Sequence, residues 1–321
     1  MISIEPTQAS LGAIVTGVNL ARVDATQLAL IKQAFLKHAV LAFRHQSLTD
    51  EDQLRFARHF GLLQKRFSYS RARERLNSDE LVDVSNLDAD GQLLKADDPQ
   101  RQMNQADRQF HTDASFQLVP AIISILCSKE LPPTGGNTEF ADMRAVHHAL
   151  SDDDKALCAE LVIEHDIFQS RTRIGFTSLR PEVRTLRPPV PQVLVRIHEE
   201  TGRPSIYLGA HAARVIGWPL AQGRALIDRL NALATEARFI YSHPWCDGDV
   251  VMWDNRCTLH RGTEFDDLNY RRVMQRATVM DTRNSVERAM AAGRKLHVVD
   301  ENTTAEKDSA TGILERVQGT G

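Results

Sequence analysis

The sequence lacks the features that mark several large protein classes. It has only four cysteines in 321 residues and no CxxC pair, which argues against a cysteine zinc site or a disulfide framework. The 39 Lys plus Arg and 42 Asp plus Glu give a net charge of −3, without the basic excess of a nucleic-acid-binding protein. No run of about 18 apolar residues could span a membrane, and no signal-peptide pattern opens the chain. We therefore expect a cytoplasmic protein that binds small molecules rather than nucleic acid or a membrane.

Short strand-like runs are frequent, and they predict a mainly β fold with flanking helices. Apolar positions have helical spacing over 26–38, and the compact apolar run AVLAF follows at 39–43. A β-branched run at 121–130 predicts a buried strand, 193–209 reads as a hairpin, and 219–235 is an amphipathic helix. Since strands and helices do not alternate regularly, an antiparallel double-sheet barrel fits better than a doubly wound sheet.

We expect residues 1–282 to form a single domain. Two polar stretches within it, 62–110 and 166–190, hold little core material, and such stretches are more often functional than structural. They are our candidates for a lid over an active site. The polar, apolar-poor segment 283–321 is expected to be a peripheral or partly disordered tail.

The sharpest local motif is His111-Thr112-Asp113. In an extended conformation, residues two apart point to the same face, so the imidazole and the carboxylate would converge. A lone HxD is more often an ordinary histidine, but His260 follows a buried apolar run, and a sheet can return it beside the pair. Two histidines and one carboxylate leave three open positions on an octahedral metal, as in non-haem Fe(II) oxygenases.

Three arginines follow His260, and two of them share one face of a predicted strand. Arg272 and Arg276 are four residues apart, while Arg271 points away. The apolar residues around them favour a partly buried strand over a solvated edge strand. A buried arginine requires an anionic ligand or an acidic neighbour. The distal carboxylate of 2-oxoglutarate, the usual cosubstrate at such an iron site, is one such ligand.

Four motifs, in this order and spacing, resemble the TauD/TfdA family of Fe(II)- and 2-oxoglutarate-dependent dioxygenases. They are HTDASFQ, PPTGGNTEFADMR, VMWDNRCTLHRG and RRVMQRAT, and the resemblance covers about residues 10–282. LGAHA and WDNRCTLHRG are most similar to the 2,4-dichlorophenoxyacetate, or aryloxyalkanoate, branch. The resemblance implies a double-stranded β-helix (jelly-roll) core and an iron held by His111, Asp113 and His260.

The resemblance also implies how 2-oxoglutarate is bound. Thr138, in the GGNT turn, and Arg272 would hold its far carboxylate. Trp253 of the WDN motif would pack near the cosubstrate, with a plain core tryptophan as the alternative.

For the primary substrate, the resemblance implies that Arg276 faces its anionic group. His211, in GAHA, either lines the substrate pocket or is an ordinary hydrogen-bonded histidine. Three residues after His211, relatives carry a further histidine, whereas this chain has Arg214. If Arg214 lined the substrate pocket, it would change the charge of that pocket.

The implied reaction hydroxylates a C–H bond of a small anionic substrate, consumes 2-oxoglutarate and O₂, and releases succinate and CO₂. An aryloxyalkanoate would be cleaved at its ether through a hemiacetal; a sulfonate such as taurine or an alkyl sulfate is the alternative substrate. A zinc metallohydrolase would leave the two arginines unexplained and lacks an adjacent general-base glutamate. A non-catalytic jelly-roll binder would need no complete triad. We also expect the chain to form a homo-oligomer.

Overall fold

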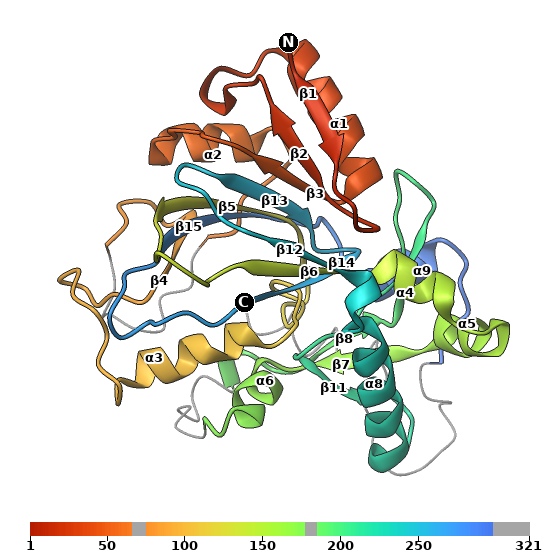
Figure 1. The fold of residues 1–321 in the computed structure, drawn as a ribbon. Helices are drawn as coiled ribbons and strands as arrows, with labels where there is room; N and C mark the ends of the chain where they lie inside the picture. The colour runs from red at the N-terminus through yellow and green to blue at the C-terminus, as the bar shows by residue number, and fades with distance from the viewer. Residues whose placement is uncertain (66–74, 177–184, 298–321) are drawn as a thin grey trace.

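The computed structural model describes residues 1–65, 75–176 and 185–297. It is mainly β with helices on the outside (Figure 1), as the sequence predicts. The strands are β1 (Ser3–Pro6), β2 (Ala13–Thr16), β3 (Val40–Phe43), β4 (Leu81–Ser85), β5 (Ala121–Glu130), β6 (Thr138–Asp142), β7 (Val162–His165), β8 (Val190–Val193), β9 (Val195–Ile197), β10 (Pro204–Ile206), β11 (Ala212–Val215), β12 (Ile240–His243), β13 (Val250–Asp254), β14 (Thr258–Gly262) and β15 (Val273–Met280). The helices are η1 (Leu20–Arg22), α1 (Ala25–His38), α2 (Asp50–Arg58), α3 (Pro99–Asn104), η2 (Gln105–Arg108), α4 (Met143–Ala149), α5 (Asp152–Glu160), α6 (Ile167–Arg173), α8 (Leu220–Ala234), η3 (Ala237–Phe239) and α9 (Ser285–Ala291).

Seven strands form a large sheet in the order β1-β2-β3-β13-β5-β15-β4. Its neighbouring strands are antiparallel except β2 and β3, which are parallel. Two three-stranded sheets, β12-β6-β14 and β11-β7-β8, lie below it in Figure 1, and β9 pairs with β10 alone. This order places β5 beside β15, so residues far apart in the sequence share one face of the large sheet.

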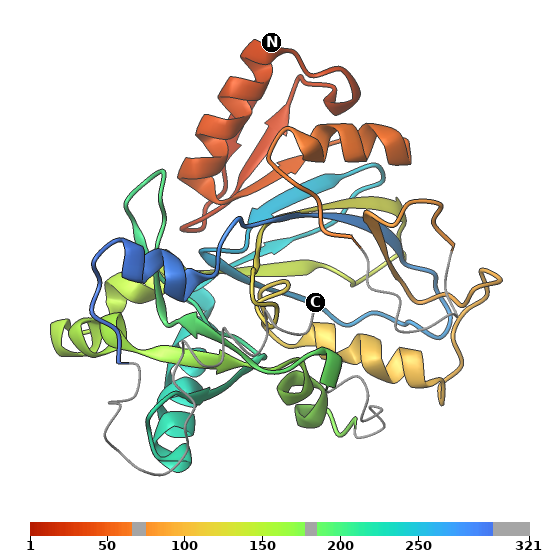
Figure 2. The ribbon, with the colours of Figure 1, turned by 180° about the vertical axis from the view of Figure 1, so that it is seen from behind.

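The two faces of the large sheet contact different parts of the molecule. On β13, Val250 and Met252 pack with α1 and α2, whereas Val251 and Trp253 point to the opposite face, as the alternation of a strand requires. Figure 2 shows α1 and α2 above the sheet from behind. On the opposite face, Trp253 packs against Phe140 of β6. Side chains on this face therefore point into the space between the large sheet and the sheet β12-β6-β14.

Local signals in the sequence fix several boundaries correctly. Helices α1 and α2 begin after Asp24 and Thr49, each of which forms a reciprocal capping box with the third helical residue. The expected hairpin is β9 with β10, and the amphipathic helix expected over 219–235 is α8, which begins after Pro219. The predicted helices over 26–38 and 219–235 and the predicted hairpin over 193–209 are confirmed.

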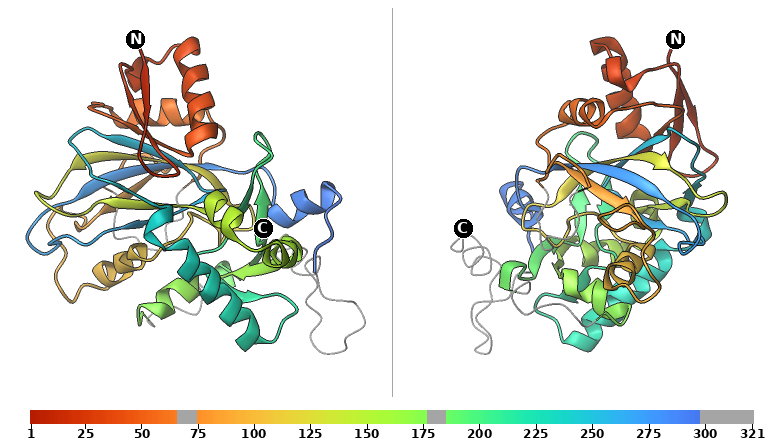
Figure 3. Two further views of the ribbon diagram at one scale, coloured as in Figure 1. Left: turned by 45° about the vertical axis from the view of Figure 1, so that its right-hand side comes forward. Right: turned by 90° about the vertical axis from the view of Figure 1, so that its left-hand side faces the viewer.

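Helices α3 and α6 lie at one end of the sheets, and α5 and α9 lie at the other (Figure 3). The first two belong to the polar stretches expected to cover an active site; residues 66–74 and 177–184 of those stretches lie outside the described residues. Within the expected tail, Val286 of α9 is buried in one cluster with Val193 of β8, so this helix is part of the folded body. Residues 298–321 lie outside the described residues. No helix in the described ranges is long and apolar enough to cross a membrane.

Candidate active site

His111 and His260 are joined through their backbones. The amide of each donates to the carbonyl of the other, at 3.0 and 2.8 Å, in an isolated β-bridge. This bridge brings the segment before β5 against β14 and leaves the two ring centroids 4.3 Å apart. Gly209 lies against the bridge with a φ of +112°, and a Cβ there would be 3.1 Å from the Cα of His111. A side chain at that position would be strained and crowded, which explains the glycine.

The two imidazoles present nitrogens suited to metal binding. Nδ1 of His111 lies 2.8 Å from the carbonyl of Gln109. It must donate there, which leaves Nε2 with a free lone pair. Nε2 of His260 lies 3.6 Å from Oδ2 of Asp113. Burial, and then the nearby His111, lower the pKa of His260 well below its ordinary value, although Asp113 opposes them. His260 is therefore neutral at pH 7, as a metal ligand must be.

Asp113 reaches the same point from a turn rather than from a strand. Only His111 of the HxD segment is in a β-bridge, and Ala114 has a positive φ of +53°. The β conformation considered for 111–113 therefore holds only at His111, and Asp113 converges on it from a turn. Oδ2 of Asp113 accepts a hydrogen bond from Ser124 at 2.6 Å, and Oδ1 accepts one from Arg276 at 2.5 Å. Burial alone would raise the pKa of Asp113, but the cationic and hydrogen-bonding neighbours, Arg276 first, lower it to about 2.

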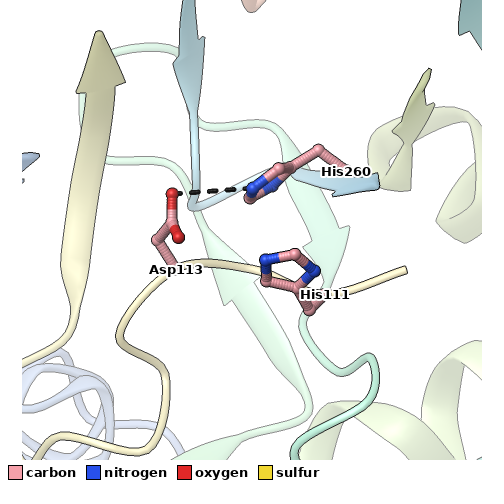
Figure 4. A group of neighbouring side chains, drawn as sticks. All are labelled: His111, Asp113 and His260. Carbon is pink, nitrogen blue, oxygen red and sulfur yellow. Dashed lines mark ion pairs between the residues drawn. The ribbon is translucent and has the colours of Figure 1, made fainter. Parts of the chain in front are cut away.

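These three side chains could hold one metal ion. One potential ligand atom from each lies within 4.8 Å of the others, and the three side chains converge in Figure 4. All three are buried, and no other such cluster occurs among the described residues. The donor set fits a divalent iron because two imidazoles and one carboxylate leave positions open for exchangeable ligands. The buried Nδ1 of His260 has no hydrogen-bond partner in the described ranges.

A pocket of about 330 Å³ opens beside this cluster. Among the residues proposed from the sequence, it is lined by His111, Asp113, His211, Arg272 and Arg276. Its walls come from β4, α3, η2 and α6 as well as from the segments around the triad. Helix α3 and helix α6 thus form part of this cavity, as expected for the two polar stretches that contain them.

Arg272 enters the pocket over a glycine turn. Its Nε donates to the carbonyl of Gly136 at 3.1 Å, and a Cβ on Gly136 would lie 3.2 Å from that side chain. Gly136 also has a φ of +67°, so both its conformation and this close approach favour glycine. Burial lowers the pKa of Arg272 to about 10, and Asp107 opposes this effect. The guanidinium therefore stays charged at pH 7 with no carboxylate bonded to it in the described residues.

Arg276 and Arg271 point to different surroundings, as strand alternation predicts. Arg276 faces the pocket with Arg272, while Arg271 is exposed and pairs with Glu130 at 2.9 Å. Unexpectedly, Arg276 forms its ion pair with Asp113, inside the candidate metal cluster. One of its N–H groups is therefore already engaged by a protein carboxylate.

Thr138 and Trp253 do not line the pocket in the described structure. The hydroxyl of Thr138 accepts a hydrogen bond from Trp245 at 3.0 Å, so its own hydrogen remains available for donation. Trp253 is buried with its ring 4.6 Å from that of His260, and its Nε1 donates to Asn255 at 3.1 Å. Trp253 thus packs behind the candidate metal cluster as a core residue.

His211 lies in the pocket and Arg214 does not. The ring of His211 is 5.9 Å from that of His111 and 4.9 Å from that of Phe116. Burial, and then Arg171, lower the pKa of His211 well below its ordinary value, so it is neutral. Arg214 pairs with Glu164 across β11 and β7 at 3.0 Å. It therefore leaves the charge of the pocket unchanged.

Comparison with known proteins agrees with this geometry. Residues 3–278 match the family model described as taurine catabolism dioxygenase TauD, TfdA family. The chain belongs to the TauD/TfdA family. A relative from Burkholderia sp. (strain RASC), an alpha-ketoglutarate-dependent 2,4-dichlorophenoxyacetate dioxygenase, is 42% identical over 246 residues, 76% of this chain and 82% of that protein. An (S)-phenoxypropionate/alpha-ketoglutarate-dioxygenase from Delftia acidovorans is 33% identical over 83% of this chain and 90% of its own length.

A solved TauD/TfdA-like structure is also similar throughout. The crystal structure of AAD-2 in complex with Mn(II) and N-oxalylglycine is 39% identical and has a TM-score of 0.81. The match covers 89% of this chain and 98% of that one. The likeness therefore extends over most of the fold.

Three residues of the site are not among those predicted from the sequence. Ser124 and Asn255 hold Asp113, and Arg171 lines the pocket. Ser124 had a signal, because it is a polar residue within an otherwise apolar run. Asn255 directly follows the buried run of β13, another position where a polar side chain needs a partner. Arg171 had no distinguishing signal beyond its polar surroundings.

Proposed function

We propose that this protein is an Fe(II)- and 2-oxoglutarate-dependent dioxygenase that hydroxylates a C–H bond of an aryloxyalkanoate. The observation that carries the proposal is a buried cluster of two histidines and one carboxylate beside a pocket that Arg272 and Arg276 both line. The relatives named above support the aryloxyalkanoate as substrate. The large sheet and the sheet β12-β6-β14 that packs against it would form the double-stranded β-helix, or jelly roll, of this family.

His111, Asp113 and His260 would hold the iron through Nε2, a carboxylate oxygen and Nε2. When bound, iron supplies activation of O₂ coupled to oxidative decarboxylation of 2-oxoglutarate to succinate and CO₂. The protein keeps the His260 imidazole neutral and the Asp113 carboxylate charged, so neither of these two ligands must lose a proton near pH 7. The hydrogen bond from His111 to Gln109 fixes the imidazole tautomer that leaves Nε2 free.

Arg272 would bind the far carboxylate of 2-oxoglutarate. It is a buried guanidinium whose remaining N–H groups have no carboxylate partner in the described structure, and binding an anion would compensate that burial. The free hydroxyl hydrogen of Thr138 would donate to the same carboxylate, since Trp245 already donates to its oxygen. Trp253 would stabilise this region from behind, through His260.

The substrate would occupy the rest of the pocket. Arg276 would face its anionic group, and His211 would contribute a neutral ring to the wall. Val82, Phe116 and Phe265 supply apolar surface for an aromatic ring. Fixing the acid group and the ring together orients one C–H toward the metal. Hydroxylation next to the ether oxygen of an aryloxyacetate gives a hemiacetal that collapses to a phenol and glyoxylate.

Residues of α3, η2 and α6, which belong to the two polar stretches, would exclude water from this space. We propose that residues 1–282 act as one domain together with α9, which packs against it. The cysteines among the described residues are free, which suits a cytoplasmic protein. A homo-oligomer stays a prediction, to be checked by light scattering.

The test is coupled product formation. Enzyme with Fe(II), 2-oxoglutarate and O₂ should release succinate and phenol in equal amounts from phenoxyacetate. Without O₂, Fe(II) and 2-oxoglutarate should give a visible charge-transfer band that His111→Ala abolishes and His148→Ala, at an exposed histidine, retains. Coupled turnover of taurine or an alkyl sulfate, with only uncoupled turnover of aryloxy acids, would replace the substrate class. Failure to form the band would refute the dioxygenase.

A further inference from the structure

Arg171 brings another cation to the pocket from a different wall than Arg272 and Arg276. It lies on α6, while the other two belong to β15 and the residue before it. Its side chain lines the pocket together with His211 and Phe116. Its Nη1 donates to the hydroxyl of Ser170 at 2.8 Å. In the described part of the chain no carboxylate forms an ion pair with it.

The other pocket arginines are already accounted for. Arg101 and Arg108 both pair with Asp267, at 2.8 and 3.3 Å. Arg276 pairs with Asp113, and the proposed function assigns Arg272 to the cosubstrate. Arg171 is thus the one pocket guanidinium of the described residues that remains without an anionic partner.

The burial of the Arg171 guanidinium favours a bound anion. Burial lowers its pKa, and among the described residues the exposed Asp107 at the pocket wall is the carboxylate that opposes this. The neighbouring His211 is neutral and adds no second charge. A desolvated guanidinium without a partner is costly, and a bound anion would remove that cost.

The position of Arg171 is tied to that of the metal cluster. Gln109 donates from Nε2 to the carbonyl of Ser170 at 2.8 Å, next to Arg171. The carbonyl of the same Gln109 accepts from Nδ1 of His111. One residue therefore connects the start of the metal cluster to the turn of α6 that carries the guanidinium.

We propose that Arg171 binds the acidic group of the primary substrate from α6 and determines the preference of the pocket for anions. This rests on the proposed function and names a residue for its substrate. The acid, a carboxylate or a sulfonate, would accept from the free N–H groups of Arg171, with Phe116 beside it for the apolar part of the molecule. Arg276, engaged by Asp113, has fewer groups to offer.

The experiment compares phenoxyacetate with its uncharged amide in wild type, Arg171→Gln, Arg171→Lys and the control Arg173→Gln. Arg173 lies on the same helix but pairs with Asp228 at 3.2 Å and does not line the pocket. Arg171→Gln should raise KM for the acid about 10- to 100-fold, because a hydrogen-bonded charge is lost. The KM for the amide and the kcat should change little, Arg171→Lys should recover part of the loss, and the control should match wild type.

Binding gives a second readout that does not require turnover. In anaerobic titrations of the enzyme with Fe(II) and 2-oxoglutarate, Arg171→Gln should weaken phenoxyacetate binding and leave the charge-transfer band unchanged. An unchanged ratio of acid to amide affinity in Arg171→Gln would overturn the proposal, as would an equal loss for both ligands. Absence of the band in wild type would instead refute the dioxygenase, so the two failures are distinguishable.

Discussion

The hydroxyl of Ser124 donates a hydrogen bond of 2.6 Å to the carboxylate of Asp113, and Asn255 holds that hydroxyl in turn. Nδ2 of Asn255 donates to Ser124 at 2.9 Å, while its Oδ1 accepts from the backbone amide of Asp113 and from Trp253, each at 3.1 Å. All of these groups are buried. One side-chain amide therefore fixes both the backbone and the carboxylate of a proposed metal ligand.

Removing this support should weaken metal binding more than it weakens the fold. Ser124→Ala or Asn255→Ala should reduce Mn(II) or Fe(II) affinity about 10- to 100-fold, since the carboxylate loses its fixed orientation. Calorimetric titration of the metal-free protein measures this. Ser128→Ala is the matched control, because Ser128 lies on the same face of β5 but bonds the carbonyls of Cys246 and Asp249. Equal losses of affinity in Ser124→Ala and Ser128→Ala would contradict the prediction.

Arg272→Gln should act on the cosubstrate alone. The pocket would lose the buried charge proposed for the far carboxylate, so KM for 2-oxoglutarate should rise about 10- to 100-fold while metal affinity stays. Arg271→Gln is the neighbouring control, as Arg271 is exposed and pairs with Glu130. Initial rates at varied 2-oxoglutarate concentration measure this KM. Similar KM values for 2-oxoglutarate in the two variants would mean that the charge of Arg272 does not bind the cosubstrate.

Arg276→Gln should have two effects where Arg171→Gln has one. Arg276 is the foremost of the neighbours that lower the pKa of Asp113, so its loss should raise that pKa and weaken metal binding at acidic pH. It should also raise KM for the anionic substrate more than KM for 2-oxoglutarate. Metal titrations at pH 7 and pH 5, run beside substrate kinetics, separate these effects. Unaltered metal affinity at both values would show that the ion pair does not support the ligand.

Much of the site could be predicted because its signals are local. The HxD spacing, the later histidine and the alternation of Arg271 and Arg272 are read directly from the chain, and Thr49 marks the start of its helix. Asn255 differs, because its partners Ser124 and Asp113 are brought together only by pairing of β13 with β5. The period-two spacing predicts that His111 and Asp113 converge, but it cannot detect the left-handed conformation of Ala114 that ends the bridge in a turn.

Stability below neutral pH should depend on a buried histidine away from the proposed metal ligands. His165 is fully buried, its ring lies 5.6 Å from that of Tyr207, and neither ring nitrogen has a hydrogen-bond partner in the described structure. Burial lowers its pKa to about 3. In the unfolded chain the pKa returns to about 6.5, so the unfolded state binds more protons below that pH. Stability is therefore intact above about pH 6.5 and is lost as pH falls toward 3.

His165→Phe should remove this loss because phenylalanine keeps the aromatic contact and does not titrate. Between pH 7 and pH 5 the wild-type free energy of unfolding should fall by about 2 kcal/mol more than that of the variant, at about 1.4 kcal/mol per pH unit. Urea unfolding of the metal-free proteins at pH 7, 6 and 5 measures the difference, and the other buried histidines contribute equally to both. His148→Ala, at an exposed position, should follow wild type. Parallel curves for His165→Phe and wild type would show that His165 finds a compensating partner in the fold.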